Sequence, residues 1–195
     1  VNDRDFVWVV GPNGGGKTTL VRILMGLLRP RQGSVRIFGT DVLSARRRIG
    51  YMPQNPYVDR LFPVTVMDVT LTGPLSAGIL PYRYTAADRQ TAEGALDMVG
   101  LSAQARMPLY ELSGGQQRRL FIARALACEP ELLILDEPAA ALDPIARQRF
   151  LDLLLDIIRD SGRTVLISSH ILSDIEKIID HVLILDEGRI LRDTG

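Results

Sequence analysis

Short apolar runs alternate along the chain with longer segments whose apolar residues recur at helical spacing. The runs are rich in β-branched and aromatic residues, as buried strands are, and occupy residues 6–10, 35–39, 49–53, 132–135, 164–168 and 182–185. The helical segments occupy residues 18–28, 66–71, 85–99, 113–127, 145–158 and 172–179. This alternation predicts an α/β fold with a mostly parallel central sheet and right-handed crossovers between its strands.

The middle of the chain departs from this alternation. Between about residues 65 and 127 the pattern is mainly helical, and Thr85 with Asp88 three residues later is a capping signature for one of these helices. We therefore expect one domain, residues 1–195, in which a helical lobe is inserted into a sheet core. The core is predicted to comprise residues 1–64 and 128–195, and the lobe about residues 65–127.

Composition narrows the classes of function. The 195 residues include 23 Lys and Arg and 23 Asp and Glu, so the formal net charge is zero. Such a chain has no general electrostatic reason to bind nucleic acid, and we expect no nucleic-acid partner. Its 46% hydrophobic content excludes a disordered chain. The one cysteine, Cys128, excludes an internal disulfide, and no run is long and apolar enough to predict a membrane span or a signal peptide.

The clearest chemical motif follows the first predicted strand. Residues 11–18 read Gly-Pro-Asn-Gly-Gly-Gly-Lys-Thr, which fits the pattern of a phosphate-binding P-loop between a strand and a helix. Glycines let backbone N–H groups turn inward around phosphate oxygens, and the following helix N-terminus favours the same anion. A glycine-rich turn without function is the alternative, and the flanking elements argue against it. The residues expected to bind nucleotide here are Asn13, Gly14, Gly15, Gly16, Lys17, Thr18 and Thr19.

Acidic and polar residues follow the other buried strands. Asp136 and Glu137 follow the strand at 132–135. Asp136 is predicted to hold Mg²⁺ through water, the Thr18 hydroxyl to bind the same ion, and Glu137 to orient or deprotonate the attacking water. Gln54 is a candidate weak Mg²⁺ ligand that senses the γ-phosphate. His170 is a candidate donor to the γ-phosphate, and it joins Glu137 and Lys17 as predicted catalytic residues.

A second anion site is predicted at the start of another helix. Ser113 caps the helix, and Gly114 and Gly115 expose backbone N–H groups at its positive end, within the run 112–116. One ATP cannot easily reach both this end and the Lys17 loop, because the helical lobe stands away from that loop. Two copies placed head-to-tail resolve the problem, with each lending Ser113, Gly114, Gly115 and Gln116 to the other copy's ATP.

Together, these motifs resemble the ATP-binding subunits of ABC transporters over essentially the whole chain. The match includes the Lys17 loop, Gln54, the run 112–116, the Asp136–Glu137 pair, then Asp143 in a D-loop and His170 as a switch histidine. The resemblance implies ATP hydrolysis with Mg²⁺ in a closed homodimer or with an equivalent second subunit. It also implies a peripheral location on the cytoplasmic face of the membrane, a membrane-spanning permease as partner, and an extracytoplasmic substrate-binding protein.

Different segments of the chain resemble different branches of the family. Residues 59–69 resemble the zinc/manganese importers, whereas 143–147 and 168–174 resemble subunits of multidrug or ABC-2-type exporters. Metal import is therefore the preferred function. Export, a soluble ABC-type ATPase and a low-turnover ATP-gated dimerisation switch are the alternatives. In this family an upstream strand carries an aromatic residue that stacks on adenine; only ten residues precede Gly11 in the sequence given, so we expect that strand to be missing from it. Ala140 also stands where the D-loop usually has Ser.

Overall fold

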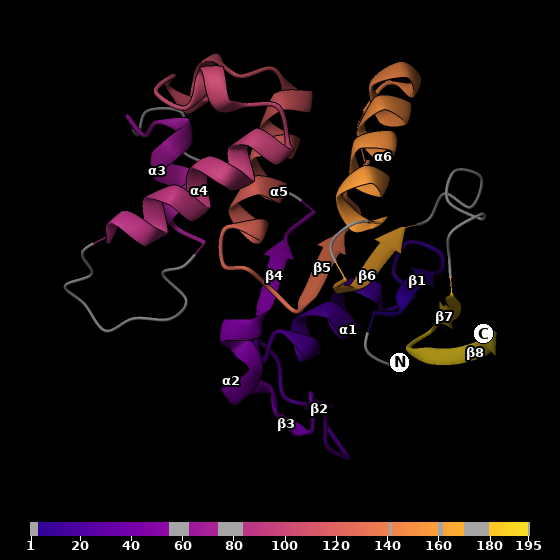
Figure 1. Ribbon diagram of the computed structural model, residues 1–195. Helices are drawn as coiled ribbons and strands as arrows, with labels where there is room; N and C mark the ends of the chain where they lie inside the picture. Colours follow the sequence, from indigo (N-terminus) through magenta and orange to yellow (C-terminus); the bar gives the residue numbers. More distant parts are fainter. Residues whose placement is uncertain are drawn as a thin grey trace.

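The computed structural model describes residues 4–54, 63–73, 84–140, 142–159, 162–169 and 180–194. Its main sheet has six strands within these residues, in the order β4-β5-β6-β1-β7-β8 (Figure 1). The strands are β1 (Phe6–Val10), β4 (Ile49–Met52), β5 (Leu132–Asp136), β6 (Thr164–Ser169), β7 (His181–Asp186) and β8 (Arg189–Thr194). A separate short hairpin pairs β2 (Arg36–Ile37) with β3 (Thr40–Asp41).

The sheet is parallel except at one edge, which confirms the predicted fold class. β4, β5, β6, β1 and β7 are parallel neighbours, and β8 pairs antiparallel with β7. Every residue of β1, β5 and β6 is buried. Burial on both faces explains why these strands read as continuous apolar runs. Because the parallel strands run the same way, their carboxyl ends gather along one edge.

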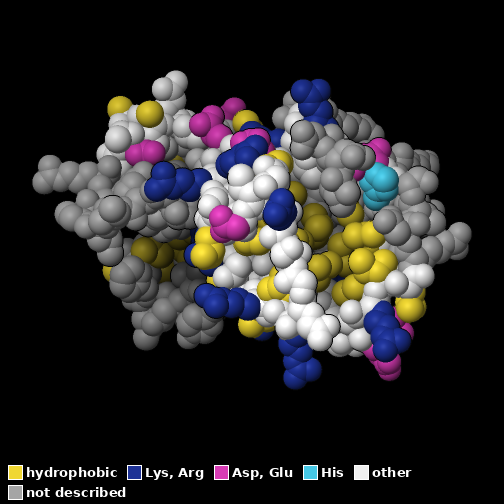
Figure 2. All heavy atoms as spheres, turned by 90° about the horizontal axis from the view of Figure 1, so that it is seen from below, with side chains coloured by type: hydrophobic (Ala, Val, Ile, Leu, Met, Phe, Trp, Pro, Cys, Tyr) yellow, Lys and Arg dark blue, Asp and Glu magenta, His cyan; other side chains and the backbone are white. Residues whose placement is uncertain are grey.

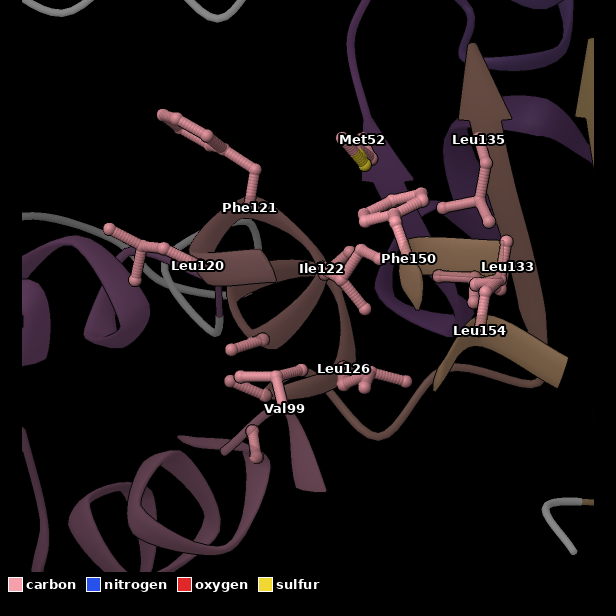
Figure 3. Packing of buried hydrophobic residues seen from close by; sticks show 14 of the residues in the cluster. Met52, Val99, Leu120, Phe121, Ile122, Leu126, Leu133, Leu135, Phe150 and Leu154 are labelled. Atoms are coloured by element: carbon pink, nitrogen blue, oxygen red, sulfur yellow. The ribbon is translucent and has the colours of Figure 1, made fainter. Parts of the chain in front are cut away.

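Helices cover both faces of the sheet. α1 (Lys17–Leu24) and α2 (Val42–Ala45) pack on one face, in a core that includes Val9, Ile134 and Leu166 (Figure 1). α5 (Gly114–Leu126) and α6 (Pro144–Arg159) cover the other face. Figure 3 shows Ile122 of α5 among Phe150 and the side chains of β5 in this second core. Figure 2 shows the lower face of the molecule, where hydrophobic side chains are exposed among Lys and Arg.

The helical lobe is built from α3 (Val66–Leu71), α4 (Ala86–Met98) and α5, with the short turns η3 (Ser102–Gln104) and η4 (Leu109–Glu111). Reciprocal capping boxes at Thr65, Thr85 and Ser113 start the three helices. In each, the cap hydroxyl accepts from the backbone N–H three residues later, and the side chain of that residue accepts from the backbone N–H of the cap, which fixes where the helix begins. No helix among the described residues is both long enough and apolar enough to cross a bilayer.

Two predicted elements differ from the structure. The helix expected to reach residue 28 ends at Leu24, because Gly26 adopts a φ of 64° and the N–H of Leu27 donates to the carbonyl of Arg22. The helix thus ends at a glycine, and the apolar residues Leu27 and Leu28 beyond it made the predicted helix too long. The strand expected at 35–39 is only the two-residue β2, because the next residues, Phe38 and Gly39, have left-handed backbone angles. The short turn η1 (Arg46–Arg48) follows α2. The helix expected at 172–179 lies outside the described residues.

Candidate nucleotide site

The loop between β1 and α1 has the backbone that its glycines allow. Gly14 and Gly16 have φ of 83° and 105°, a region that residues with a β-carbon rarely adopt. Gly11 is required for a different reason, because an added β-carbon would lie 2.0 Å from the carbonyl oxygen of Leu185. The N–H of Gly188 also donates to the Gly15 carbonyl. β7 and the turn after it therefore fix the back of the loop.

Lys17 is the first residue of α1, and its side chain turns back across the loop. Its Nζ donates to the carbonyl oxygens of Gly11 at 2.7 Å and Pro12 at 3.1 Å. The same Nζ lies 3.5 Å from Oε1 of Glu137, and the two side chains are only 7% and 5% exposed. Lys17 follows β1 and Glu137 follows β5, so this ion pair spans the end of β6, the strand between them. Two predicted site residues are thus in direct contact.

The end of β5 is held by β6. Oδ1 of Asp136 accepts a 2.6 Å hydrogen bond from Oγ of Ser168, its register partner. The backbone N–H of Glu137 donates to both Oγ and the carbonyl oxygen of Ser168. Glu137 itself has a φ of 47°, in the left-handed region that is strained for a residue with a side chain. Sequence reasoning missed Ser168, although its place at the end of a parallel strand was a usable signal.

Gln54 lies at the same edge of the sheet. β4 pairs with β5 so that Met52 faces Leu135, and Gln54 follows two residues later, partly exposed. Tyr51, also missed, is close enough to Asp136 to respond to its charge. Burial raises the pKa of the Tyr51 phenol, the charge of Asp136 raises it further, and Arg22 acts in the opposite direction. The Gln54 loop and the acidic strand end therefore share one edge.

The helix start predicted as a second anion site is capped by a reciprocal pair of hydrogen bonds. Oγ of Ser113 accepts from the N–H of Gln116, and the Gln116 side chain accepts from the N–H of Ser113. Ser113 and Gly114 are exposed, and no atom lies within 4 Å of a β-carbon added at Gly114 or Gly115. Among the described residues, the interactions of Lys17 join it to Gly11, Pro12 and Glu137 rather than to this helix end.

The remaining predicted residues are placed as follows. Thr18 and Thr19 lie in the first turn of α1, with Thr18 partly buried and Thr19 exposed, and Asn13 is exposed in the loop. Asp143 caps α6 by accepting from the N–H groups of two residues in its first turn. His170 lies outside the described residues.

A glycine loop backed by a strand and a helix, with a buried lysine paired to the second of two strand-end carboxylates, defines a P-loop nucleotide hydrolase. The sequence profile of the ABC transporter family matches residues 1–140. The chain therefore belongs to the ABC transporter family, and it is an ATPase of that family. The resemblance drawn from the motifs is thus confirmed.

Individual relatives agree with this assignment. The manganese transport system ATP-binding protein MntA of Synechocystis is 41% identical over 180 residues, covering 91% of this chain and 69% of that protein. The zinc transport system ATP-binding protein TroB of Treponema pallidum is 40% identical, covering 91% and 66%. A solved ABC transporter described as metal-chelate type, in an inward-facing conformation, matches with a TM-score of 0.87 at 32% identity, covering 100% and 73%. The dimeric cassette MJ0796 bound to ADP and Pi matches with a TM-score of 0.82 at 28% identity, covering 100% and 87%.

Proposed function

We propose that this chain is the ATP-hydrolysing subunit of a transporter that imports manganese or zinc ions. The observation that carries the ATP-driven part is the buried contact between Lys17 and Glu137, because it brings the phosphate-binding lysine and the candidate base to one point. The similarity to manganese and zinc transport proteins supports the cargo. In this proposal the subunit lies on the cytoplasmic face of the membrane, where ATP is available.

The proposed site works by exchange of partners at Lys17. In the structure, the buried ammonium is compensated by Glu137 and two loop carbonyls. A buried charge needs such compensation, and a β- or γ-phosphate of ATP offers a stronger one. When Lys17 turns to the phosphates, Glu137 is released to orient the attacking water and accept its proton. The N–H groups of the glycine loop and of the first turn of α1 bind the remaining phosphate oxygens.

The residues present also fit a Mg²⁺ ion. The Thr18 hydroxyl, the Asp136 carboxylate and the Gln54 amide are hard oxygen donors of the kind this cation prefers. Ser168 holds one oxygen of Asp136 and so fixes the orientation of that carboxylate. A bound Mg²⁺ would neutralise charge that develops on the phosphates during hydrolysis.

The second half of the site is proposed to come from another copy. Ser113, Gly114, Gly115 and Gln116 form an exposed helix start whose N–H groups suit a γ-phosphate. Asp143 and His170 of the D-loop and switch segments are proposed to act at the same junction. The dimeric form of the MJ0796 cassette supports a paired arrangement.

The membrane partners follow from the same proposal. A permease would dock near Gln54 and the helical lobe, so that a change at the sheet edge on ATP binding is transmitted to the permease. An extracytoplasmic binding protein would deliver the ion. This subunit need not contact the ion itself.

Reconstitution tests the proposal. The protein is purified with its permease, placed in proteoliposomes with ATP on the cytoplasmic side, and assayed for uptake of radioactive manganese or zinc. ATP-dependent accumulation of either ion, lost in Lys17→Ala, is the expected result. Outward movement of a drug-like substrate would favour the exporter alternative, and ATP hydrolysis without any co-purifying permease would favour a soluble ATPase. Either outcome contradicts metal import.

A further inference from the structure

Arg118 joins helix α5 to the turn that carries Glu137. It lies in the second turn of α5, partly buried, and Nη1 donates to the carbonyl oxygens of Pro138 at 2.9 Å and Glu137 at 3.4 Å. Burial lowers the pKa of its guanidinium, which nevertheless stays charged because arginine titrates so far above neutrality. A charged donor thus holds the two carbonyls that follow the candidate base.

The helix that carries Arg118 is itself held firmly. A β-carbon on Gly50 of β4 would lie 2.4 Å from the carbonyl oxygen of Ala125, so this glycine permits very close packing of α5 on the sheet. Gly73, after α3, has the same relation to the Arg124 carbonyl, at 2.2 Å. Ile122 packs from α5 among the buried side chains of the sheet (Figure 3). Arg118 therefore projects from a rigid support.

The turn that Arg118 contacts needs such support. Glu137 has a left-handed φ of 47°, and its N–H donates to Ser168 of β6. Strained backbone persists only where its surroundings over-determine it. With Ser168 holding the N–H and Arg118 holding the carbonyl, the peptide on each side of Glu137 is fixed. The direction of the Glu137 side chain follows from that backbone.

We propose that Arg118 is a positioning residue for ATP hydrolysis, which fixes the backbone at Glu137 and so aims its carboxylate at the attacking water. The inference rests on the proposed role of Glu137. Ser113 begins the same helix five residues earlier, or about 7.5 Å along the axis. The helix that presents Ser113 to one nucleotide therefore also supports the base that acts on another.

Arg119 provides a matched control. It is the next residue on α5 and donates through Nη1 to the carbonyl oxygen of Val99, at the end of α4, at 3.0 Å. It thus ties α5 to the end of α4, whereas Arg118 ties α5 to the backbone that follows β5. Arg118→Met removes a guanidinium from two carbonyls and Arg119→Met removes one from a single carbonyl, and both variants keep an aliphatic side chain.

The test compares kcat, KM and ATP affinity in the purified protein. We expect Arg118→Met to lower kcat by roughly tenfold to a hundredfold, as a misplaced catalytic group does, with KM and calorimetric ATP affinity within about twofold of wild type. Arg119→Met is expected to keep kcat within about twofold even where both variants lose similar thermal stability. If Arg118→Met does not fold, Arg118→Gln replaces it; glutamine reaches at most one of the two carbonyls, and an intermediate kcat is expected.

Three outcomes would overturn the proposal. A wild-type kcat in Arg118→Met or Arg118→Gln would remove Arg118 from the role. An equal loss of kcat in Arg119→Met would show that the loss in Arg118→Met comes from a less stable α5 and not from a misplaced Glu137. A Glu137→Gln variant with Arg118 unchanged that hydrolyses ATP at the wild-type rate would overturn the proposed role of Glu137 and this inference with it, whereas the first two outcomes leave that role standing.

Discussion

Replacing Glu137 with Gln removes one charge and one proton acceptor while keeping the shape of the side chain. In the structure this carboxylate is 5% exposed and lies 3.5 Å from the ammonium of Lys17. Its backbone N–H bonds to Ser168, and those bonds are unaffected by the change. The substitution is therefore expected to act on charge and proton transfer rather than on the local backbone.

The structure separates the effect on stability from the effect on rate. Lys17 keeps its bonds to Gly11 and Pro12, so the loss of folding free energy is expected at about 1–3 kcal/mol rather than the roughly 3–5 kcal/mol of a buried pair broken outright. Loss of a positioned base lowers kcat by about 10²–10⁴-fold, or roughly 3–5 kcal/mol of barrier. ATP affinity is expected to be unchanged or higher, because Lys17 no longer has to leave a carboxylate.

Three measurements on the same protein check this. Phosphate release gives kcat, calorimetry gives ATP affinity, and gel filtration with ATP reveals whether a dimer accumulates once hydrolysis is blocked. Glu131→Gln is the control, because Glu131 lies just before β5 in an exposed ion pair with Arg48, a kind of pair that contributes little. Steady hydrolysis by Glu137→Gln at the wild-type rate would refute the reasoning.

Three further changes follow from the same site. Lys17→Ala is expected to abolish measurable ATP binding, since it removes the buried cation that faces the phosphates; unchanged affinity by calorimetry would contradict this. Gly11→Ala is expected to cost about 3 kcal/mol or more of folding free energy, because its β-carbon would meet the Leu185 carbonyl oxygen; a urea unfolding curve like that of wild type would count against the packing. Ser168→Ala is expected to cost about 1.5–3 kcal/mol, because it removes the hydroxyl that donates to the Asp136 carboxylate; a loss below about 0.5 kcal/mol in the same assay would argue against that bond.

Much of the fold was readable from local pattern. The strand at Phe6–Val10 and the cap at Ser113 were predicted at the positions where they occur, because continuous burial and a polar cap each leave a direct mark on the sequence. The helix after the P-loop was predicted four residues too long, because apolar spacing continued past the glycine that ends it. The antiparallel strand β8 carried no pattern of its own, because residues 189–191 are all exposed and therefore show no alternation of buried and exposed positions.

The site was predicted where chemistry follows from residue type and missed where it follows from packing. Sequence motifs identify Lys17 and Glu137, but the 3.5 Å contact between them depends on the order of the strands, which the motifs do not give. Ser168 is an ordinary strand residue until its register with Asp136 is known. Arg118 reads as a solvated helix residue until α5 is placed against the end of β5. The division into residues 1–64 with 128–195 and the lobe at about 65–127 stays a prediction.

We propose that ATP is bound between the Lys17 loop of one copy and the Ser113 helix start of another. Asn13→Cys and Gly114→Cys test it directly, since Asn13 is exposed and a β-carbon at Gly114 meets no atom within 4 Å. Each cysteine substitution is made in a protein that also carries Cys128→Ala, which removes the native thiol, and Glu137→Gln, which blocks hydrolysis. The two proteins are mixed and treated with a short thiol cross-linker. We expect a cross-linked pair of copies that forms with ATP and is absent without it. Equal cross-linking in both conditions, or none with ATP although calorimetry shows ATP bound, would contradict it.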